Sequence, residues 1–423
     1  MPERDTIFAL SSGALPAAIA VMRITGPDAK RAVEQLVGPV PPPRHAALRA
    51  IRRDGDILDS GLVLFFPGPR SATGEDLVEL QLHGSRAVVA AVSEALVSVA
   101  GLRPARAGEF TRRAFENGRI DIVAAEGLGD LLAAETETQR RVALGMVAGG
   151  LSARVERWRG SILQASAQVE AALDFGDEDD VVPWPGQGAA LAALAADITA
   201  ALTDPPAERL RDGFKIAIVG PPNAGKSTLL NALVDRDAAI TSPIAGTTRD
   251  IIEVPVQIDG IPLIFLDTAG LRSAPGDPIE AIGIARAEAA LASADLVLAL
   301  GPVALSVPHV LQISARCDCD PPRDGAELNV SAHTGAGMAV LRATIVERAV
   351  ALLPRADAIA ANLRQRRCMA MACADLEKAS ATDDLLIVAE HLRHARLALD
   401  ELLGRTGVED MLDALFARFC IGK

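Results

Sequence analysis

The stretch Gly220–Thr228, with the sequence GPPNAGKST, has residue types and spacing that suit the binding of phosphate. In the pattern G-x-x-x-x-G-K-S, Gly220 and Gly225 let the backbone curl so that successive N–H groups point at an anion. Lys226 adds a positive charge, and Ser227 is placed to ligate the magnesium ion that accompanies a nucleoside triphosphate. The alternative is a glycine-bearing turn that matches the pattern by chance.

The segments on both sides of this stretch place it between a strand and a helix. Residues 214–219 form an apolar run that predicts a buried strand, and residues 228–234 predict the start of a helix. A helix N-terminus adds a favourable dipole to an anion site. Strand, loop and helix in this order are typical of a nucleotide-binding domain.

Three further motifs follow in the order that a GTP-binding domain requires. Residues 246–250 (GTTRD) supply Thr248, which we expect to contact the magnesium ion and sense the γ-phosphate. Residues 267–270 (DTAG) end a predicted strand, so that Asp267 would hold the metal through water and the Gly270 N–H would meet the γ-phosphate. Residues 331–333 (SAH) match a loop that braces a guanine base. In this order and spacing the motifs predict a GTP-binding domain.

The expected guanine-reading motif, Asn-Lys-x-Asp, is altered in this chain. Ala315 and Arg316 stand where asparagine and lysine belong, whereas Asp318 is retained. A carboxylate is the group that accepts both N1–H and N2–H₂ of guanine. We therefore expect selectivity for GTP over ATP to persist, with weaker affinity for the base.

The group that positions the attacking water is also unusual. Leu271 follows the DTAG motif, where Ras-like switches carry a water-orienting glutamine. Glu280 lies shortly after it, and a carboxylate there could position the water directly or through a second water. An exposed glutamate at the start of a helix is the alternative interpretation of Glu280.

Composition limits the class of protein. A chain of 423 residues with 50% hydrophobic residues is long enough for about three domains. The net charge of −13 argues against a broad basic surface for nucleic acid, and 3% aromatic residues provide few stacking platforms. The N-terminus does not resemble a signal peptide, no apolar run is long enough for a membrane span, and the five cysteines fit no zinc pattern. We expect a cytoplasmic protein.

The pattern of elements predicts a multidomain chain that combines α/β and all-α parts. Residues 1–117 predict a mixed α+β domain with strands at 18–23, 61–66 and 77–82 and a helix at 87–100. Residues 118–212 predict helices with an apolar stripe from Leu151 to Leu173, which we interpret as core packing. The acidic residues 177–180 predict a solvated loop, with a metal site as the alternative.

The second half of the chain alternates strands and helices and then becomes helical. Residues 213–352 predict a doubly wound parallel sheet with strands at 263–267, 295–300, 310–313 and 328–330 and helices near 281–292 and 337–352. Residues 353–423 predict a helix at 383–403 and a last helix from a Thr406-x-x-Glu409 capping box to about Phe419. We therefore expect a helical bundle that an inserted GTPase domain interrupts.

Several stretches spread along the chain carry a resemblance to a known family. They are Asp5–Ile7, Met22–Gly26, Pro67–Pro69, Thr73–Asp76, Gly108–Thr111, Asp267–Arg272, Ile282–Ile284 and the C-terminal Cys420-Ile421-Gly422-Lys423. In these stretches the chain resembles the bacterial tRNA modification GTPase MnmE (TrmE) family, over nearly its full length. This resemblance implies an N-terminal tetrahydrofolate-binding and dimerisation domain, a helical domain and an inserted GTPase domain.

The resemblance also implies a reaction and partners. The family works as a homodimer with the flavoprotein MnmG (GidA), in a heterotetramer that binds tRNA. Together they add an aminomethyl or carboxymethylaminomethyl group to C5 of the wobble uridine, with a one-carbon unit from 5-formyl- or methylene-tetrahydrofolate. Family-like folate positions are Arg23, Glu79, Arg119 (often lysine) and Lys423. Cys420 resembles the signature cysteine needed for modification, and a buried free thiol is its alternative interpretation.

The family's GTPases depend on potassium, which can neutralise charge in the transition state. Asn223, Ser242, Ile244 and Thr247 match the K⁺ ligands, Ser227 and Thr248 the Mg²⁺ ligands, and Glu280 the catalytic glutamate. The full set expected at GTP is Asn223, Ala224, Gly225, Lys226, Ser227, Thr228, Ser242, Pro243, Ile244, Ala245, Gly246, Thr247, Thr248, Asp267, Thr268, Ala269, Gly270, Asp318, Ser331, Ala332 and His333.

Two other functions compete with a tRNA-modifying GTPase. A ribosome-assembly switch would also hydrolyse GTP, but it needs neither the N-terminal domain nor the terminal Cys-Ile-Gly-Lys. An ATP-dependent kinase is disfavoured by Ser331-Ala332 and by Thr248.

Overall fold

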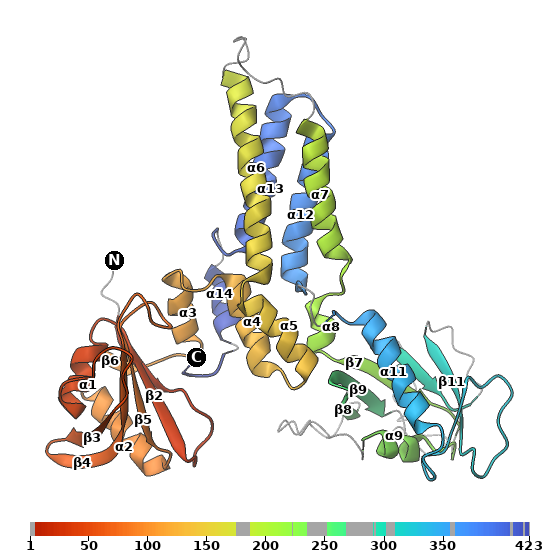
Figure 1. Ribbon diagram of the computed structural model, residues 1–423, viewed down its shortest axis with the longest axis horizontal. Helices are drawn as coiled ribbons and strands as arrows, with labels where there is room; N and C mark the ends of the chain where they lie inside the picture. The colour runs from red at the N-terminus through yellow and green to blue at the C-terminus, as the bar shows by residue number, and fades with distance from the viewer. Residues whose placement is uncertain are drawn as a thin grey trace, which may run out of the picture. The chain divides into compact units, whose positions relative to one another are not determined.

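The computed structural model describes residues 5–174, 187–221, 223–234, 252–267, 291, 293–301, 309–355, 360–406, 409–417 and 419–422. The chain divides into two compact units, Met1–Gly129 with Asp400–Lys423, and Asp130–Leu399. Figure 1 shows their elements, most of them labelled. None of the helices within these residues is long and apolar enough to cross a membrane.

The first unit contains a six-stranded sheet in the order β3-β4-β5-β2-β1-β6. Neighbouring strands are antiparallel, except that β1 and β6 are parallel. The strands are β1 (Thr6–Leu10), β2 (Ile19–Thr25), β3 (Ala47–Arg53), β4 (Asp56–Phe66), β5 (Leu77–His83) and β6 (Leu102–Pro104). The strands expected at 18–23, 61–66 and 77–82 are thus confirmed as β2, β4 and β5, although β4 begins earlier than predicted.

Two helices, α1 (Ala29–Val37) and α2 (Arg86–Val97), share one apolar core with this sheet. The hydroxyl of Ser85 caps α2 by accepting a hydrogen bond from the Val88 N–H. The helix ends at Val97 rather than near residue 100, because a turn leads the chain directly into β6.

The C-terminal segment of the chain belongs to the same unit. Helix α14 (Glu409–Phe416) packs on α3 (Glu109–Glu116), and the Phe115 and Phe416 rings are 6.4 Å apart. The predicted last helix is therefore confirmed, but it ends at Phe416 rather than near Phe419. Beyond it, Ile421 forms a β-bridge with Ala107.

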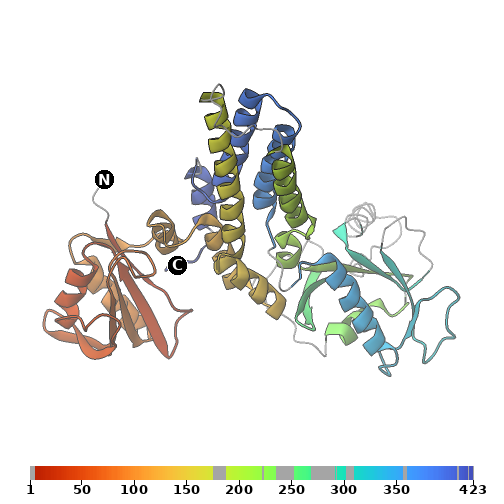
Figure 2. The same ribbon diagram turned by 45° about the horizontal axis from the view of Figure 1, so that its top comes forward.

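Long helices from before and after the predicted nucleotide-binding region lie side by side in the second unit (Figures 1 and 2). The predicted stripe on α6 is buried from Leu151 to Val169, but Leu173, near the end of the helix, is 41% exposed and was wrongly placed in the core. The helices are α5 (Glu137–Val147), α6 (Gly150–Asp174), α7 (Gln187–Thr203), α8 (Ala207–Arg211), α12 (Leu363–Ser380) and α13 (Leu385–Leu402), with α4 (Ile122–Ala133) preceding them.

The second unit also contains a six-stranded sheet in the order β12-β11-β10-β7-β9-β8. All neighbours are parallel except the edge pair β8 and β9. Its elements are β7 (Phe214–Val219), α9 (Lys226–Val234), β8 (Ile252–Ile258), β9 (Ile261–Asp267), β10 (Leu296–Ala299), β11 (Val310–Ala315), β12 (Leu328–Val330) and α11 (Met338–Leu352). The predicted sheet and its expected strands are confirmed, with an antiparallel edge strand added.

The chain enters and leaves this sheet region at neighbouring points. The Ala207 N–H donates a hydrogen bond to the Ala361 carbonyl at 3.2 Å. The Leu363 N–H donates to the Glu208 carboxylate at 2.9 Å. These bonds fix the start of α8 against the segment that begins α12, as an inserted domain requires.

Candidate functional site

The predicted phosphate loop connects β7 directly to α9. Strand β7 is buried between its parallel neighbours β9 and β10, and α9 begins at Lys226. Gly225 has φ +90°, a conformation that a residue with a side chain rarely adopts. The sequence therefore folds locally into the strand, loop and helix that were expected.

The ammonium group of Lys226 lies within the curve of this loop. Its Nζ donates hydrogen bonds to the carbonyls of Gly220 at 2.8 Å and Pro221 at 2.9 Å. Ser227 and Thr228 are exposed in the first turn of α9, where the backbone N–H groups have no partner within the helix. Asn223 has φ +62° and Ala224 is half-buried. A positive side chain and a helix N-terminus thus meet at one place, which suits a phosphate group.

The other nucleotide motifs end strands of the same sheet. Strand β9 ends at Asp267, β11 at Ala315 and β12 at Val330. Because these strands run parallel to β7, their carboxyl ends lie at the edge that carries the phosphate loop. Asp267, Asp318 and Ser331 are therefore brought to the same edge as Lys226, as the sequence predicted.

Hydrogen bonds fix the loop that would recognise the base. The Asp318 carboxylate has a lowered pKa, chiefly because it accepts a hydrogen bond from the Ser331 side chain. Ser331 is buried, and its N–H donates to the Ala336 carbonyl at 2.9 Å. The Cys317 N–H donates to the Val330 carbonyl at 3.1 Å. Asp318 is exposed and ionised, while half-buried Ala332 and exposed His333 follow Ser331.

Arg316 connects this loop to the phosphate loop, a contact that sequence reasoning missed. Its backbone has φ +66°, and its Nη1 lies 3.4 Å from the Asn223 carbonyl oxygen. A Cβ atom at Gly225 would lie 3.6 Å from the Arg316 Cγ. The alkyl part of Arg316 therefore covers the phosphate loop, where the altered motif would ordinarily supply a lysine.

Several predicted site residues lie outside the described residues. They are Ser242, Pro243, Ile244, Ala245, Gly246, Thr247, Thr248, Thr268, Ala269, Gly270, Glu280 and Lys423, together with the acidic residues 177–180.

In the first unit, Arg23 and Glu79 face each other across β2 and β5. Their Nε and Oε1 atoms are 2.8 Å apart, and both side chains are partly exposed. Arg119 is exposed, and its Cγ lies beside Gly74 in the loop before β5. The structure thus pairs two of the predicted folate residues and leaves the third accessible.

The C-terminal tail lies against the end of β1. The Ser11 hydroxyl donates a hydrogen bond to the Gly422 carbonyl at 2.8 Å. Gly422 has φ +96°, and a Cβ there would collide with the Leu10 carbonyl. Cys420 is exposed, so the alternative of a buried free thiol is wrong.

A buried network of charges supports this region and was not predicted. Arg113 is 6% exposed and contacts Glu75 at 3.0 Å and Glu109 at 3.2 Å. Glu109 also contacts Arg103 at 2.6 Å. Burial opposes the charge of Glu109, but hydrogen bonds from Arg103 and from the Arg106 N–H hold its pKa at about 2. Glu75 and Glu109, which both belong to the family-like stretches, therefore form ion pairs with the same arginine, Arg113.

Comparisons with known proteins cover both units. The family model described as the GTP-binding protein TrmE N-terminus matches residues 6–119, and the MnmE helical domain model matches residues 122–420. The tRNA modification GTPase MnmE of Novosphingobium aromaticivorans is 52% identical over 99% of this chain and 100% of its own. That of Rhizorhabdus wittichii is 53% identical over 99% of this chain and 97% of its own.

The chain belongs to the MnmE family of tRNA modification GTPases. It is therefore a GTP hydrolase that acts in tRNA modification.

Proposed function

We propose that this MnmE-family protein uses GTP hydrolysis to drive the addition of an aminomethyl or carboxymethylaminomethyl group to C5 of the wobble uridine. The observation that carries the proposal is the attachment of the nucleotide-binding region to the helical bundle. The hydrogen bonds between Ala207 and Ala361 and between Leu363 and Glu208 hold the two ends of the nucleotide-binding region next to each other. A change in the nucleotide site can therefore act on the bundle through two adjacent connections.

The residues of the phosphate loop fit a nucleoside triphosphate with magnesium. Lys226 and the N–H groups at the start of α9 bind and orient the phosphates, and Asp318 accepts hydrogen bonds from guanine. Ser227, Thr248 and Asp267 would hold Mg²⁺, which neutralises charge on the phosphates. Glu280 would orient the attacking water.

Arg316 replaces the lysine of the guanine-reading motif in this proposal. Its contact with the Asn223 carbonyl fixes the base loop to the phosphate loop, although Ala315 offers no side-chain amide. Base and phosphate recognition would then remain coupled through one arginine side chain.

A potassium ion beside the phosphates would complete the site. Asn223 would provide a ligand from the phosphate loop, and Ser242, Ile244 and Thr247 would provide the others. The backbone of Asn223 adopts a left-handed conformation, which asparagine tolerates better than most residues. This conformation places Asn223 in the tight turn of the phosphate loop and is compatible with its role as a ligand. The ion would supply positive charge where an arginine finger acts in other GTPases.

The first unit would bind the folate one-carbon donor. Glu79 can accept hydrogen bonds from pterin N–H groups, while Arg23, Arg119 and Lys423 can bind carboxylates. Arg23 lies opposite Ala9 on β1, and the C-terminal tail contacts Leu10 at the end of that strand and Ser11 directly after it. This neighbourhood favours a shared site for the folate and the exposed Cys420.

The proposed assembly is a homodimer that joins the flavoprotein MnmG (GidA) in a heterotetramer and meets tRNA there, in the cytoplasm. A net charge of −13 supports the need for such a partner in binding RNA.

Mass analysis of wobble nucleosides from cells lacking this gene tests the proposal. We expect the C5-modified uridines to disappear and to return when the gene is restored. Unchanged C5-modified uridines would show that the protein acts elsewhere on tRNA.

A further inference from the structure

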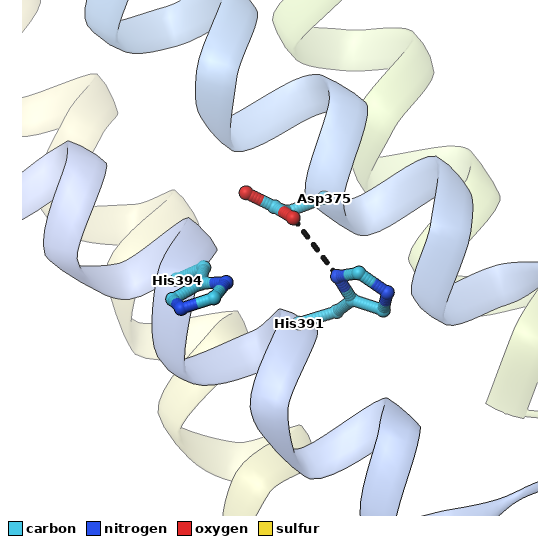
Figure 3. A group of neighbouring side chains, drawn as sticks. All are labelled: Asp375, His391 and His394. Carbon is cyan, nitrogen blue, oxygen red and sulfur yellow. Dashed lines mark hydrogen bonds and ion pairs between the residues drawn. The ribbon is translucent and has the colours of Figure 1, made fainter.

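Helices α12 and α13 bring together three side chains that the nucleotide site does not use. Asp375 lies on α12, and His391 and His394 lie three residues apart on α13, so that both histidines share one face of that helix (Figure 3). Each residue offers one potential metal-ligating atom, and the three atoms lie within 4.8 Å of one another. The side chains of Asp375 and His391 are 18% and 23% exposed, and that of His394 is 44% exposed.

The distances are close to those that a metal site requires. The His391 Nδ1 lies 2.9 Å from the Asp375 Oδ1. Two ligand atoms of a tetrahedral zinc ion, at bonds of about 2.0–2.1 Å, are separated by roughly 3.3 Å. The pair therefore needs only a small shift to admit an ion. His394 must move further, and its exposure gives it the freedom to do so.

The local charge favours a divalent cation. Glu390 Oε1 lies 3.0 Å from His394 Nε2, and Arg393 lies 3.0 Å from the same nitrogen. Arg393 Nη2 and Glu390 Oε1 are 2.7 Å apart, so the charges of these two side chains cancel each other. Asp375 then leaves one net negative charge beside two histidines. Glu390 is also a carboxylate of the kind that orients metal-bound imidazoles.

We propose that Asp375, His391 and His394 bind one Zn²⁺-class ion that clamps α12 to α13. Two imidazoles and one carboxylate suit Zn²⁺, Co²⁺, Ni²⁺ or Cu²⁺ rather than Mg²⁺, which separates this site from the magnesium of the nucleotide. Water would occupy the fourth position of a tetrahedral ion. The competing explanation is a hydrogen bond between the two helices that binds no metal.

Titration of the full-length, metal-stripped, nucleotide-free protein with Zn²⁺ tests the site by calorimetry. We expect one ion per chain in wild type. Asp375→Asn and His394→Ala should each weaken Zn²⁺ binding by more than the roughly 10–100-fold loss that changes outside the ligand shell can cause. His394→Ala removes a partly exposed side chain, so its folding is checked by circular dichroism.

The pair His83 and Asp59 provides the matched control. Its Nδ1 and Oδ1 atoms are 2.7 Å apart, but within the described residues it belongs to no group of three ligands. His83→Ala should leave the zinc stoichiometry unchanged.

Cobalt distinguishes the proposed ligands from the thiols of half-buried Cys317 and exposed Cys319, which could also bind zinc. Bound Co²⁺ should show visible bands without the strong near-ultraviolet band of sulfur ligation. The proposal is overturned if wild type binds no Zn²⁺, if Asp375→Asn and His394→Ala bind as wild type does, or if the cobalt spectrum reports thiolate.

Discussion

Replacement of Glu109 by glutamine should destabilise the first unit and remove part of its acid sensitivity. Glu109 accepts hydrogen bonds from the Arg106 N–H and from the side chains of Arg103 and Arg113. Its side chain is 13% exposed, and its pKa is about 2 instead of 4.5. Glutamine keeps the size of the side chain but removes the negative charge that Arg103 and Arg113 share. Asp5 remains as the acidic partner of Arg103, and Glu75 as that of Arg113.

The size of the effect follows from the pKa. A fall from 4.5 to about 2 corresponds to about 3 kcal/mol of stability at neutral pH, and contact with solvent reduces this to about 2 kcal/mol. Because the pKa is lowered by folding, the stabilisation is present above pH 4.5 and is lost as the pH falls towards 2. The difference between wild type and Glu109→Gln should therefore shrink over that interval.

Hydrogen exchange measured by mass spectrometry gives a local readout. Amides of β1 and α3 should exchange faster in Glu109→Gln at neutral pH. Fluorescence should change little, because Trp158 and Trp184 both belong to the second unit. Glu116→Gln is the matched control, since Glu116 pairs with Arg112 at the surface of the same helix and is worth less than about 1 kcal/mol. Equal exchange in the two variants would refute the assigned role of the buried network.

Three predictions concern the nucleotide site. Arg316→Ala should weaken GTP binding about fivefold in equilibrium titration, through loss of one hydrogen bond of roughly 1 kcal/mol, whereas Arg316→Lys should recover part of it; unchanged affinity in Arg316→Ala would exclude the coupling role. Glu280→Ala should bind GTP but hydrolyse it very slowly in a phosphate-release assay, and near-normal turnover would remove Glu280 from the mechanism. Potassium should stimulate hydrolysis and sodium should not, so equal rates in the two salts would contradict the K⁺ assignment.

The parts of the fold that could be predicted from the sequence depend on local pattern. The strand, glycine loop and helix around Lys226 have constrained residues within a short stretch, so the motif and its structure coincide. The long apolar stripe on α6 likewise predicted the buried face of the helix correctly, except at Leu173. Leu173 lies near the end of the helix, where the core no longer covers its side chain. Strands β1 and β6 have only 5 and 3 residues, too few for a periodic signal, and depend on their neighbours in the sheet. Strand β3 has 7 residues, but its sequence ALRAIRR does not alternate apolar and polar residues.

The parts that could not be predicted depend on contacts between distant residues. The approach of Arg316 to Asn223 requires the order of the strands and a left-handed backbone at Arg316, and neither follows from a local motif. Arg113 and Glu75 are also far apart in the sequence, yet they form a buried ion pair. Glu75 and Glu109 both lie in the family-like stretches, and this is the signal that could have revealed the network. If these carboxylates are buried, they require cationic partners such as Arg113.

The central claim is that GTP hydrolysis in the inserted region drives tRNA modification, and reconstitution of the reaction tests it most directly. The purified protein would be combined with the proposed flavoprotein partner, the proposed folate one-carbon donor and unmodified tRNA, and the wobble nucleoside measured by mass spectrometry. The account predicts C5-modified uridine with GTP, and almost none with a non-hydrolysable GTP analogue or with Lys226→Ala. Equal modification under all three conditions would contradict it.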